Sequence, residues 1–439
     1  MKKYGKFLLF FLFFLFIIIF NLLFVINNLD EIWNYGFSYA IRLGEIPYKD
    51  FNMVIPPLYS FIMTIPLLIS NSYLSFIIFH ALIVTLEFYL LYKMFDKKIY
   101  FLIIISLMFF PLIYPTYNFF FLFLMILIIY FEKSNIKYKD YLIGFLVACC
   151  ILTKHSVGIF FIIPSILFIK KSNISLVKRI IGFIIPNIIF LIYLLLTGTL
   201  YDFLDLCLFG MFDFTNNSNG FGLAVFLFLI LVIVSIIMIA KNKKDISNYY
   251  LIFSYLLFVP LFDNLHLFYV IFSFTILFIN IVGDIRLRYE LIFYTCLIAI
   301  IFTFGKTMNV LEYQKNNLKH FEYKNISRKN VMYSNEIASF IKDNASIIYN
   351  DDAYFYRIIS NQKIGYLDLV NHGNHGYNGS KKIIKLIEKN NDKIFLIKKD
   401  CYKRIANKET QLDKEGFEYI IKNGKKIDTL LDYDLYVLN

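Results

Sequence analysis

Four short stretches of this sequence place ionisable side chains directly beside an apolar segment. The stretches are Asp30–Glu31, GEIPYKDF at 44–51, TKHS at 153–156 and DNLH at 263–266. An ionisable group at the depth of a bilayer costs about 2.5–3.5 kcal/mol. Groups that stay so close to lipid usually line a wet cavity or bind a charged ligand, so these stretches hold the candidate functional residues.

The composition is that of an integral membrane protein. Of 439 residues, 59% are hydrophobic, against about 45–50% in a soluble globular chain. The net charge of +12 comes mainly from short loops between apolar runs and from the C-terminal part, so it reflects membrane topology and we expect no nucleic-acid partner. Neither a disulfide framework nor a CxxC site is expected from the cysteines, which are Cys149, Cys150, Cys207, Cys296 and Cys401.

Many segments are apolar enough for a membrane-spanning helix, which needs about 20 residues. They are 7–26, 54–70, 73–93, 99–114, 116–131, 141–153, 156–170, 180–198, 222–240, 249–262, 267–282 and 289–305. Lysines precede the first segment and no small-residue cleavage site follows it, which predicts an uncleaved span that starts in the cytoplasm. The basic loops at 132–140, 170–179, 241–245 and 283–288 should be cytoplasmic too.

With this topology the four ionisable stretches and the chain after residue 305 face the outside. The twelve candidate segments are an even number, whereas an N-terminus inside and a C-terminus outside require an odd number of crossings. One segment within 73–131 should therefore not cross, and FFPLIYPTYNFFF is a candidate for a broken segment. We expect an all-α, multi-pass protein of the cell membrane with about 11 transmembrane helices. The membrane domain should cover 1–305, with an external loop at 27–53, and an extracytoplasmic domain should cover 306–439.

The external loop predicts a helix over 30–44. Its polar stripe consists of residues spaced four apart, namely Asp30, Asn34, Ser38 and Arg42. The apolar face and the nearby Trp33 predict that this helix lies in the plane of the membrane. Asp30 also stands where an N-cap would, so capping is the alternative to a chemical role.

The other candidates have structural alternatives as well. Lys49 and Asp50 either bind a ligand or anchor the loop at the interface. Lys154 has no acidic neighbour in sequence, which favours an anion as its partner, although it could also be a lysine that reaches the interface and turns the hairpin. Asp263 and His266 either belong to a site or pair with each other at a helix start.

The tail after residue 333 predicts a small mixed α/β domain. SIIYNDD and KIFLIKK are typical of strands, and SKKIIKLIEKN has the apolar spacing of an amphipathic helix. The stretch NHGNHGYNGS contains His372 and His375, but a metal site would need further ligands at a definable spacing. Its Gly and Asn content favours a loop.

A family resemblance rests on these same residues. The acidic pair after the first span, GEIPYKDF followed by PPLY, the TKHSVG hairpin and the soluble tail together resemble the C-superfamily of membrane glycosyltransferases. The protein-mannosyltransferase-like and aminoarabinose-transferase-like bacterial enzymes are the most similar, over most of residues 1–305. The resemblance implies transfer of a sugar from a polyprenyl-phosphate donor in the membrane lipid to an envelope glycan, lipid or protein acceptor. We assign no cofactor and no metal ligand, and the sequence does not identify a metal requirement.

The resemblance also assigns roles to residues. It places the catalytic carboxylate on Asp30, with Glu31 beside it, as the general base for an acceptor hydroxyl in an inverting displacement. The departing lipid phosphate needs cations, for which the candidates are Arg42, Lys49, Lys154 and His266. The family's second acidic position falls on either Glu45 or Asp50. Further candidates for substrate contact are Tyr48, His155 and Asp263.

Two other functions stay open. A flippase or transporter for a lipid-linked sugar should have internal repeats and ionisable residues near the midplane. This sequence shows no repeat between its halves, and its ionisable residues gather at one face. A non-catalytic scaffold would leave that one-sided clustering unexplained.

Overall fold

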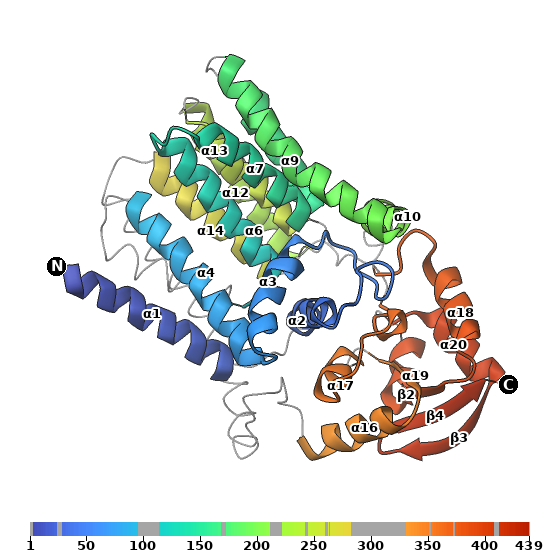
Figure 1. The fold of residues 1–439 in the computed structure, drawn as a ribbon. Coiled ribbons are helices and arrows are strands. Elements are labelled where there is room, and N and C mark those ends of the chain that lie inside the picture. The colour runs from blue at the N-terminus through green and yellow to red at the C-terminus, as the bar shows by residue number, and fades with distance from the viewer. Residues whose placement is uncertain are drawn as a thin grey trace. The chain divides into compact units, whose positions relative to one another are not determined.

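The structure is a computed structural model, and the chain is mostly helical with a small sheet near its C-terminus, as the sequence predicted (Figure 1). The residues that the structure describes are 3–23, 29–94, 114–167, 173–210, 222–241, 245–259, 262, 264–281, 331–350, 353–371, 374–407 and 412–438. The chain forms two compact units. Unit 1 comprises Met1–Val25, Ile77–Ile192 and Ser218–Gln314, and unit 2 comprises Ile26–Phe76, Tyr193–Asn217 and Lys315–Asn439.

Unit 1 is built from apolar helices. Its α-helices are α1 (Lys3–Leu23), most of α4 (Tyr73–Met94), α6 (Tyr117–Lys133), α7 (Lys139–Thr153), α8 (His155–Gly158), most of α9 (Asn173–Thr197), α12 (Leu223–Lys241), α13 (Ser247–Phe253) and α14 (Asn264–Ile281). Short 3₁₀ helices follow at η2 (Ile159–Phe161) and η5 (Ser254–Phe258), and a π-helix at η3 (Ile163–Leu167).

Three described helices are long and apolar enough to cross a membrane. They are Tyr73–Met94, Asn173–Thr197 and Leu223–Ala240. The predicted segment 289–305 and all but the last residue of 99–114 lie outside the described residues, and the number of about 11 spans stays a prediction. The predicted span at 54–70 is helical only over α3 (Leu58–Ile69). Its 12 residues reach about 18 Å, which is too short for a hydrocarbon core of about 30 Å.

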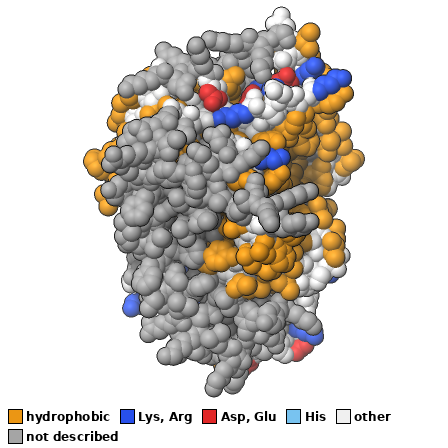
Figure 2. Space-filling model, turned by 90° about the vertical axis from the view of Figure 1, so that its left-hand side faces the viewer, with side chains coloured by type: hydrophobic (Ala, Val, Ile, Leu, Met, Phe, Trp, Pro, Cys, Tyr) orange, Lys and Arg blue, Asp and Glu red, His pale blue; other side chains and the backbone are white. Residues whose placement is uncertain are grey.

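The surface of the described helices suits contact with lipid. Helices α9 and α12 expose many large apolar side chains along their length. On the face drawn in Figure 2, hydrophobic side chains dominate the described part, and the described charged side chains lie mainly near its upper and lower edges. Because water would penalise so much exposed apolar area, a large apolar surface of this kind marks a contact with membrane or another protein.

Close backbone contacts fix the helices around α7. A Cβ atom on Gly144 of α7 would lie 1.9 Å from the carbonyl oxygen of Arg179 in α9, and one on Gly182 would lie 2.1 Å from that of Tyr141. A Cβ on Gly158 would lie 2.5 Å from the backbone of Cys150. Small residues let membrane helices approach this closely, so the glycine of TKHSVG serves helix packing.

Unit 2 joins the external loop to the tail. Outside the tail it contains α2 (Leu29–Arg42), α3, α10 (Leu200–Phe203) and the π-helix η4 (Leu204–Phe209). The tail contains α16 (Val331–Asp343), β1 (Ser346–Tyr349), α17 (Ala353–Ile359), the 3₁₀ helix η7 (Tyr366–Asp368), α18 (Gly379–Lys389), β2 (Ile394–Lys398), α19 (Lys399–Ala406), α20 (Lys414–Asn423), β3 (Gly424–Leu430) and β4 (Tyr433–Leu438). The predicted boundary at residue 305 lies outside the described residues.

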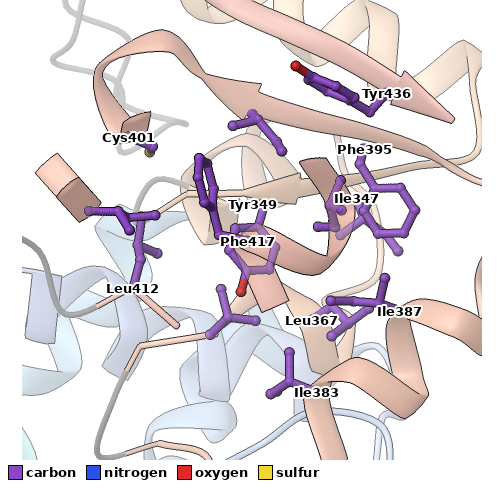
Figure 3. Close-up of a cluster of buried hydrophobic side chains, with 14 residues drawn as sticks. Ile347, Tyr349, Leu367, Ile383, Ile387, Phe395, Cys401, Leu412, Phe417 and Tyr436 are labelled. Atoms are coloured by element: carbon purple, nitrogen blue, oxygen red, sulfur yellow. The ribbon is translucent and has the colours of Figure 1, made fainter. Parts of the chain in front are cut away.

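The tail has its own core on a four-stranded sheet. The strand order is β1-β2-β4-β3; β1 and β2 are parallel, and β4 pairs antiparallel with both β2 and β3. Tyr349 and Phe395 from the strands, Ile383 of α18 and Phe417 of α20 belong to one cluster of buried hydrophobic side chains (Figure 3). The two strands and the amphipathic helix predicted from the sequence are therefore confirmed as β1, β2 and α18.

Helix α2 forms where it was predicted, within two residues, but its surroundings differ from the expectation. Residues 34–40 are all buried, including Asn34 and Ser38 of the polar stripe. The Thr64 hydroxyl of α3 donates to the Ser38 carbonyl at 3.1 Å. On another side, a Cβ on Gly36 would lie 2.4 Å from the ring of Tyr354 in α17. These stripe residues face protein, because α3 and the tail cover the helix.

Candidate functional site

The candidate site in unit 1 is centred on Lys154, at a break between two helices. Helix α7 ends at Thr153, Lys154 takes the dihedral angles φ −146° and ψ 88°, and α8 begins at His155. The break turns the Lys154 side chain into the protein, where it is buried. Its Nζ donates to the Asn118 side-chain oxygen at 2.8 Å and lies 5.5 Å from the ring centre of Tyr117.

The same asparagine also contacts His266, from the first turn of α14. The Asn118 Nδ2 atom lies 3.4 Å from His266 Nε2, and both side chains are buried. Beside them, the hydroxyl groups of Thr116 and Tyr269 are 3.5 Å apart. One amide thus links two of the four predicted phosphate-binding residues, which are far apart along the chain.

A second polar cluster lies at the other end of α6. Arg179 donates to Glu132 at 2.6 Å and to Asp140 at 3.0 Å, and its side chain is almost completely buried. Because Asn118 lies in the first turn of α6 and Glu132 in its last turn, about 20 Å of helix separate the two clusters. Within unit 1, Lys154 and His266 therefore lie at the end opposite to the predicted cytoplasmic loop 132–140.

Asn118 was not among the site residues predicted from the sequence, although a helix-start signal stands directly before it. Thr116 is the N-cap of α6, and its hydroxyl accepts from the Phe119 amide at 3.3 Å. A Thr or Ser just before an apolar run is a helix-start signal, and it would have placed Asn118 in the first turn. His155 is half-buried at the start of α8. Asp263 lies outside the described residues.

The loop 44–51 in unit 2 has a defined shape that explains several of the predicted site residues. Tyr48 has a φ of 73°, its side chain is buried, and its hydroxyl donates to the Ile55 carbonyl at 2.9 Å. Asp50 Oδ2 accepts from the Ile46 amide at 2.7 Å. Both side chains thus hold the loop together, while Lys49 between them is exposed.

Glu45 and Arg42 also make structural contacts. The buried Glu45 carboxylate accepts from the Ile364 amide of the tail at 3.1 Å. Burial raises the pKa of Glu45 to about 7, against the opposing effects of that hydrogen bond and of Lys363. Arg42 Nε donates to the Leu67 carbonyl at 2.9 Å, one of the last carbonyls of α3. Such carbonyls have no partner within their own helix.

Asp30 and Glu31 lie in the first turn of α2, which begins at Leu29. Asp30 is therefore one residue inside the helix and does not occupy the N-cap position that the sequence offered as an alternative. Their assignment as catalytic residues stays a prediction.

The described residues contain no group of three or more His, Cys, Asp or Glu side chains that could hold a metal ion. In the NHGNHGYNGS loop, His372 lies outside the described residues. His375 is buried, and its Nδ1 lies 3.8 Å from Asp413 Oδ1. Asp413 is the N-cap of α20 and accepts from the Gly416 amide at 2.7 Å, so this carboxylate has a structural use.

The arrangement in unit 1 suits an anion. A lysine brings up to three donors, and a histidine brings one or two, depending on its protonation. The neutral Asn118 amide contacts both side chains and adds no negative charge of its own. Comparison of this chain with protein-family models, curated proteins and solved structures gave no match.

Proposed function

We propose that this protein is a membrane glycosyltransferase that moves a sugar from a polyprenyl-phosphate donor to an acceptor hydroxyl, with inversion, on the outer face of the cell membrane. The observation that carries the proposal is the convergence of Lys154 and His266 on Asn118. Residues 118 and 266 are 148 positions apart, and the short stretches that contain Lys154 and His266 interrupt otherwise apolar sequence.

The chemistry of the leaving group explains why such a cluster would be needed. A lipid phosphate departs as an anion, so it requires positive charge and hydrogen-bond donors in preference to a proton. A buried lysine acts in a medium of low dielectric constant, where its attraction for a phosphate exceeds the attraction in water. In the proposal Lys154 and His266 bind the donor phosphate, and Asn118 orients both side chains.

The acceptor hydroxyl needs a base, and Asp30 is our candidate. A positioned base contributes typically about 10²–10⁴-fold to the rate. Asp30 and Glu31 occupy the first turn of α2, a helix packed between α3 and the tail. Contacts at Gly36 and Ser38 anchor this helix on two sides, and an anchored helix is the kind of support that a positioned base requires.

The proposal includes a topology. About 11 spans would carry the chain across the membrane, with the TKHS and DNLH stretches, the external loop and the tail on the outer side. The tail would then take part in acceptor recognition, because it folds together with the external loop in unit 2.

The test is transfer from a polyprenyl phosphate that carries a radiolabelled sugar, with purified protein in proteoliposomes and an envelope extract as acceptor. Asp30→Asn should abolish transfer and still retain the labelled lipid in a binding assay. Glu415→Gln, a matched change at an exposed residue of α20, should transfer as the wild type does. Full transfer by Asp30→Asn would overturn the assignment of Asp30 as the base. Movement of the labelled lipid across the membrane without bond cleavage would overturn the proposal that the protein is an enzyme.

A further inference from the structure

The segment formed by α10 and η4 is bound to the tail by its polar side. Asp205 is buried, and its Oδ1 accepts from the Asn378 amide at 3.2 Å and from the Asn378 side chain at 2.9 Å. The Asp205 carbonyl accepts from the Tyr377 amide at 3.2 Å. Three hydrogen bonds thus attach the NHGNHGYNGS loop to a single aspartate, and the loop has a defined place.

Charge and shape strengthen the same attachment. Lys382 of α18 lies 3.1 Å from Asp202 Oδ1 and 3.8 Å from Asp205 Oδ2. Gly376 has a φ of +73°, and a Cβ there would lie 2.7 Å from Asp205 Oδ2. Only glycine adopts that conformation at little cost and leaves room for the carboxylate. Both acidic side chains of the segment are therefore directed to the tail.

The other side of the segment carries exposed apolar and aromatic side chains. Tyr201 is 72% exposed, Phe209 is 51% exposed, and Leu208 is exposed beside it. Tyr377 of the attached loop is 72% exposed, and its ring meets that of Phe209 edge-on, with 6.2 Å between the ring centres. The segment is therefore amphipathic, with an apolar surface that comes from both chain regions.

This surface begins directly after a candidate membrane span. Helix α9 is one of the three described helices that are long and apolar enough to cross a membrane, and it ends at Thr197. Leu196 in its last turn is 83% exposed, and the chain turns at Gly198, where φ is +70°. Tyr201 follows within one further turn of helix. Aromatic side chains concentrate at this depth, where lipid meets water.

We propose that Tyr201, Leu208, Phe209 and Tyr377 form a surface that inserts into the lipid interface at the end of α9. Helix α10 and η4 lie along the membrane, and the Asp205 and Lys382 contacts hold the tail to them. Tyr377 thereby brings a loop of the tail into contact with lipid. The inference needs only that α9 spans the membrane, and it stands whether or not the protein transfers a sugar.

The chain has a single tryptophan, Trp33, which makes a site-specific reporter possible. In a Trp33→Phe background, Tyr377→Trp places the fluorophore in the proposed surface, and Phe209→Trp provides a second reporter. The control is Ile427→Trp in β3, at a side chain that is 50% exposed on a strand drawn far from α10 in Figure 1. Each full-length variant is reconstituted in phosphatidylcholine vesicles, with and without bromine on the acyl chains.

Bromine quenches only a tryptophan that touches the acyl chains. We expect blue-shifted emission and a marked loss of fluorescence in brominated vesicles for the reporters at 377 and 209. We expect little loss at 427, together with strong quenching by acrylamide in the water. If the tryptophans at 377 and 209 lose as much fluorescence to brominated lipid and to acrylamide as the control at 427 does, the proposal is overturned. Equal quenching by brominated lipid at all three positions would overturn it as well.

Discussion

Replacing Glu45 by glutamine should remove a pH dependence from the contact between the external loop and the tail. The buried carboxyl has its pKa raised from 4.5 to about 7. One pKa unit corresponds to about 1.4 kcal/mol, so ionising Glu45 in place costs about 3 kcal/mol at most. The stabilisation from the protonated form is fully present below pH 4.5 and is lost as the pH rises through about 7.

The Ile364 amide reports on this contact directly, because it donates to Glu45. We expect its hydrogen-exchange protection, corrected for the intrinsic rate, to fall by up to about 100-fold from pH 5 to pH 8 in the wild type. Glu45→Gln keeps an acceptor and carries no charge, so its protection should stay nearly constant over this range. Glu415→Gln should behave as the wild type. An equal pH dependence in wild type and Glu45→Gln would refute the reasoning.

Three further predictions concern unit 1. Gly144→Ala would bring a Cβ to 1.9 Å from the Arg179 carbonyl, so we expect a loss of about 1–3 kcal/mol or more, measurable as a lower unfolding temperature in detergent. Arg179→Leu would leave Glu132 buried without its bidentate partner, which should cost about 3–5 kcal/mol, and combining it with Glu132→Gln should recover part of that loss. Asn118→Leu removes the acceptor of Lys154, and we expect the KM for the labelled lipid donor to rise about 10–100-fold; an unchanged KM would show that this amide does not position the lysine.

Several helices and strands were predicted correctly because their conformation depends on residues that are close together in the sequence. The spacing of polar residues four apart predicted α2 within two residues, and short apolar stretches predicted β1 and β2. Helix α18 followed from its apolar spacing. In each case neighbouring residues along the chain determine the conformation, so no knowledge of distant contacts was needed.

The surroundings of those elements were harder to predict. The spacing of Asn34 and Ser38 correctly identifies one face of α2, but spacing cannot say what covers that face, and here it is protein. Similarly, Asp50 and Tyr48 were singled out for their chemistry, and their side chains turn out to shape the loop 44–51. The pairing partners lie several residues away or in another helix, and a residue type alone does not reveal them.

The candidate site was predicted in part. Charge topology put Lys154 and His266 on one side of the membrane, and the structure brings both to the same end of unit 1. The asparagine between them and the attachment of Asp205 to the tail depend on contacts over 36 to 173 positions of the chain. Such contacts follow from the packing of whole helices, which a single sequence does not specify.

The central claim is that this protein transfers a sugar with Asp30 as its base. The most direct measurement is mass spectrometry of envelope glycans from cells that lack the gene, complemented with the wild type or with Asp30→Asn. We predict that one sugar disappears from a glycan on deletion, returns with the wild type and stays missing with Asp30→Asn. Identical glycans in the presence and absence of the gene would contradict the claim.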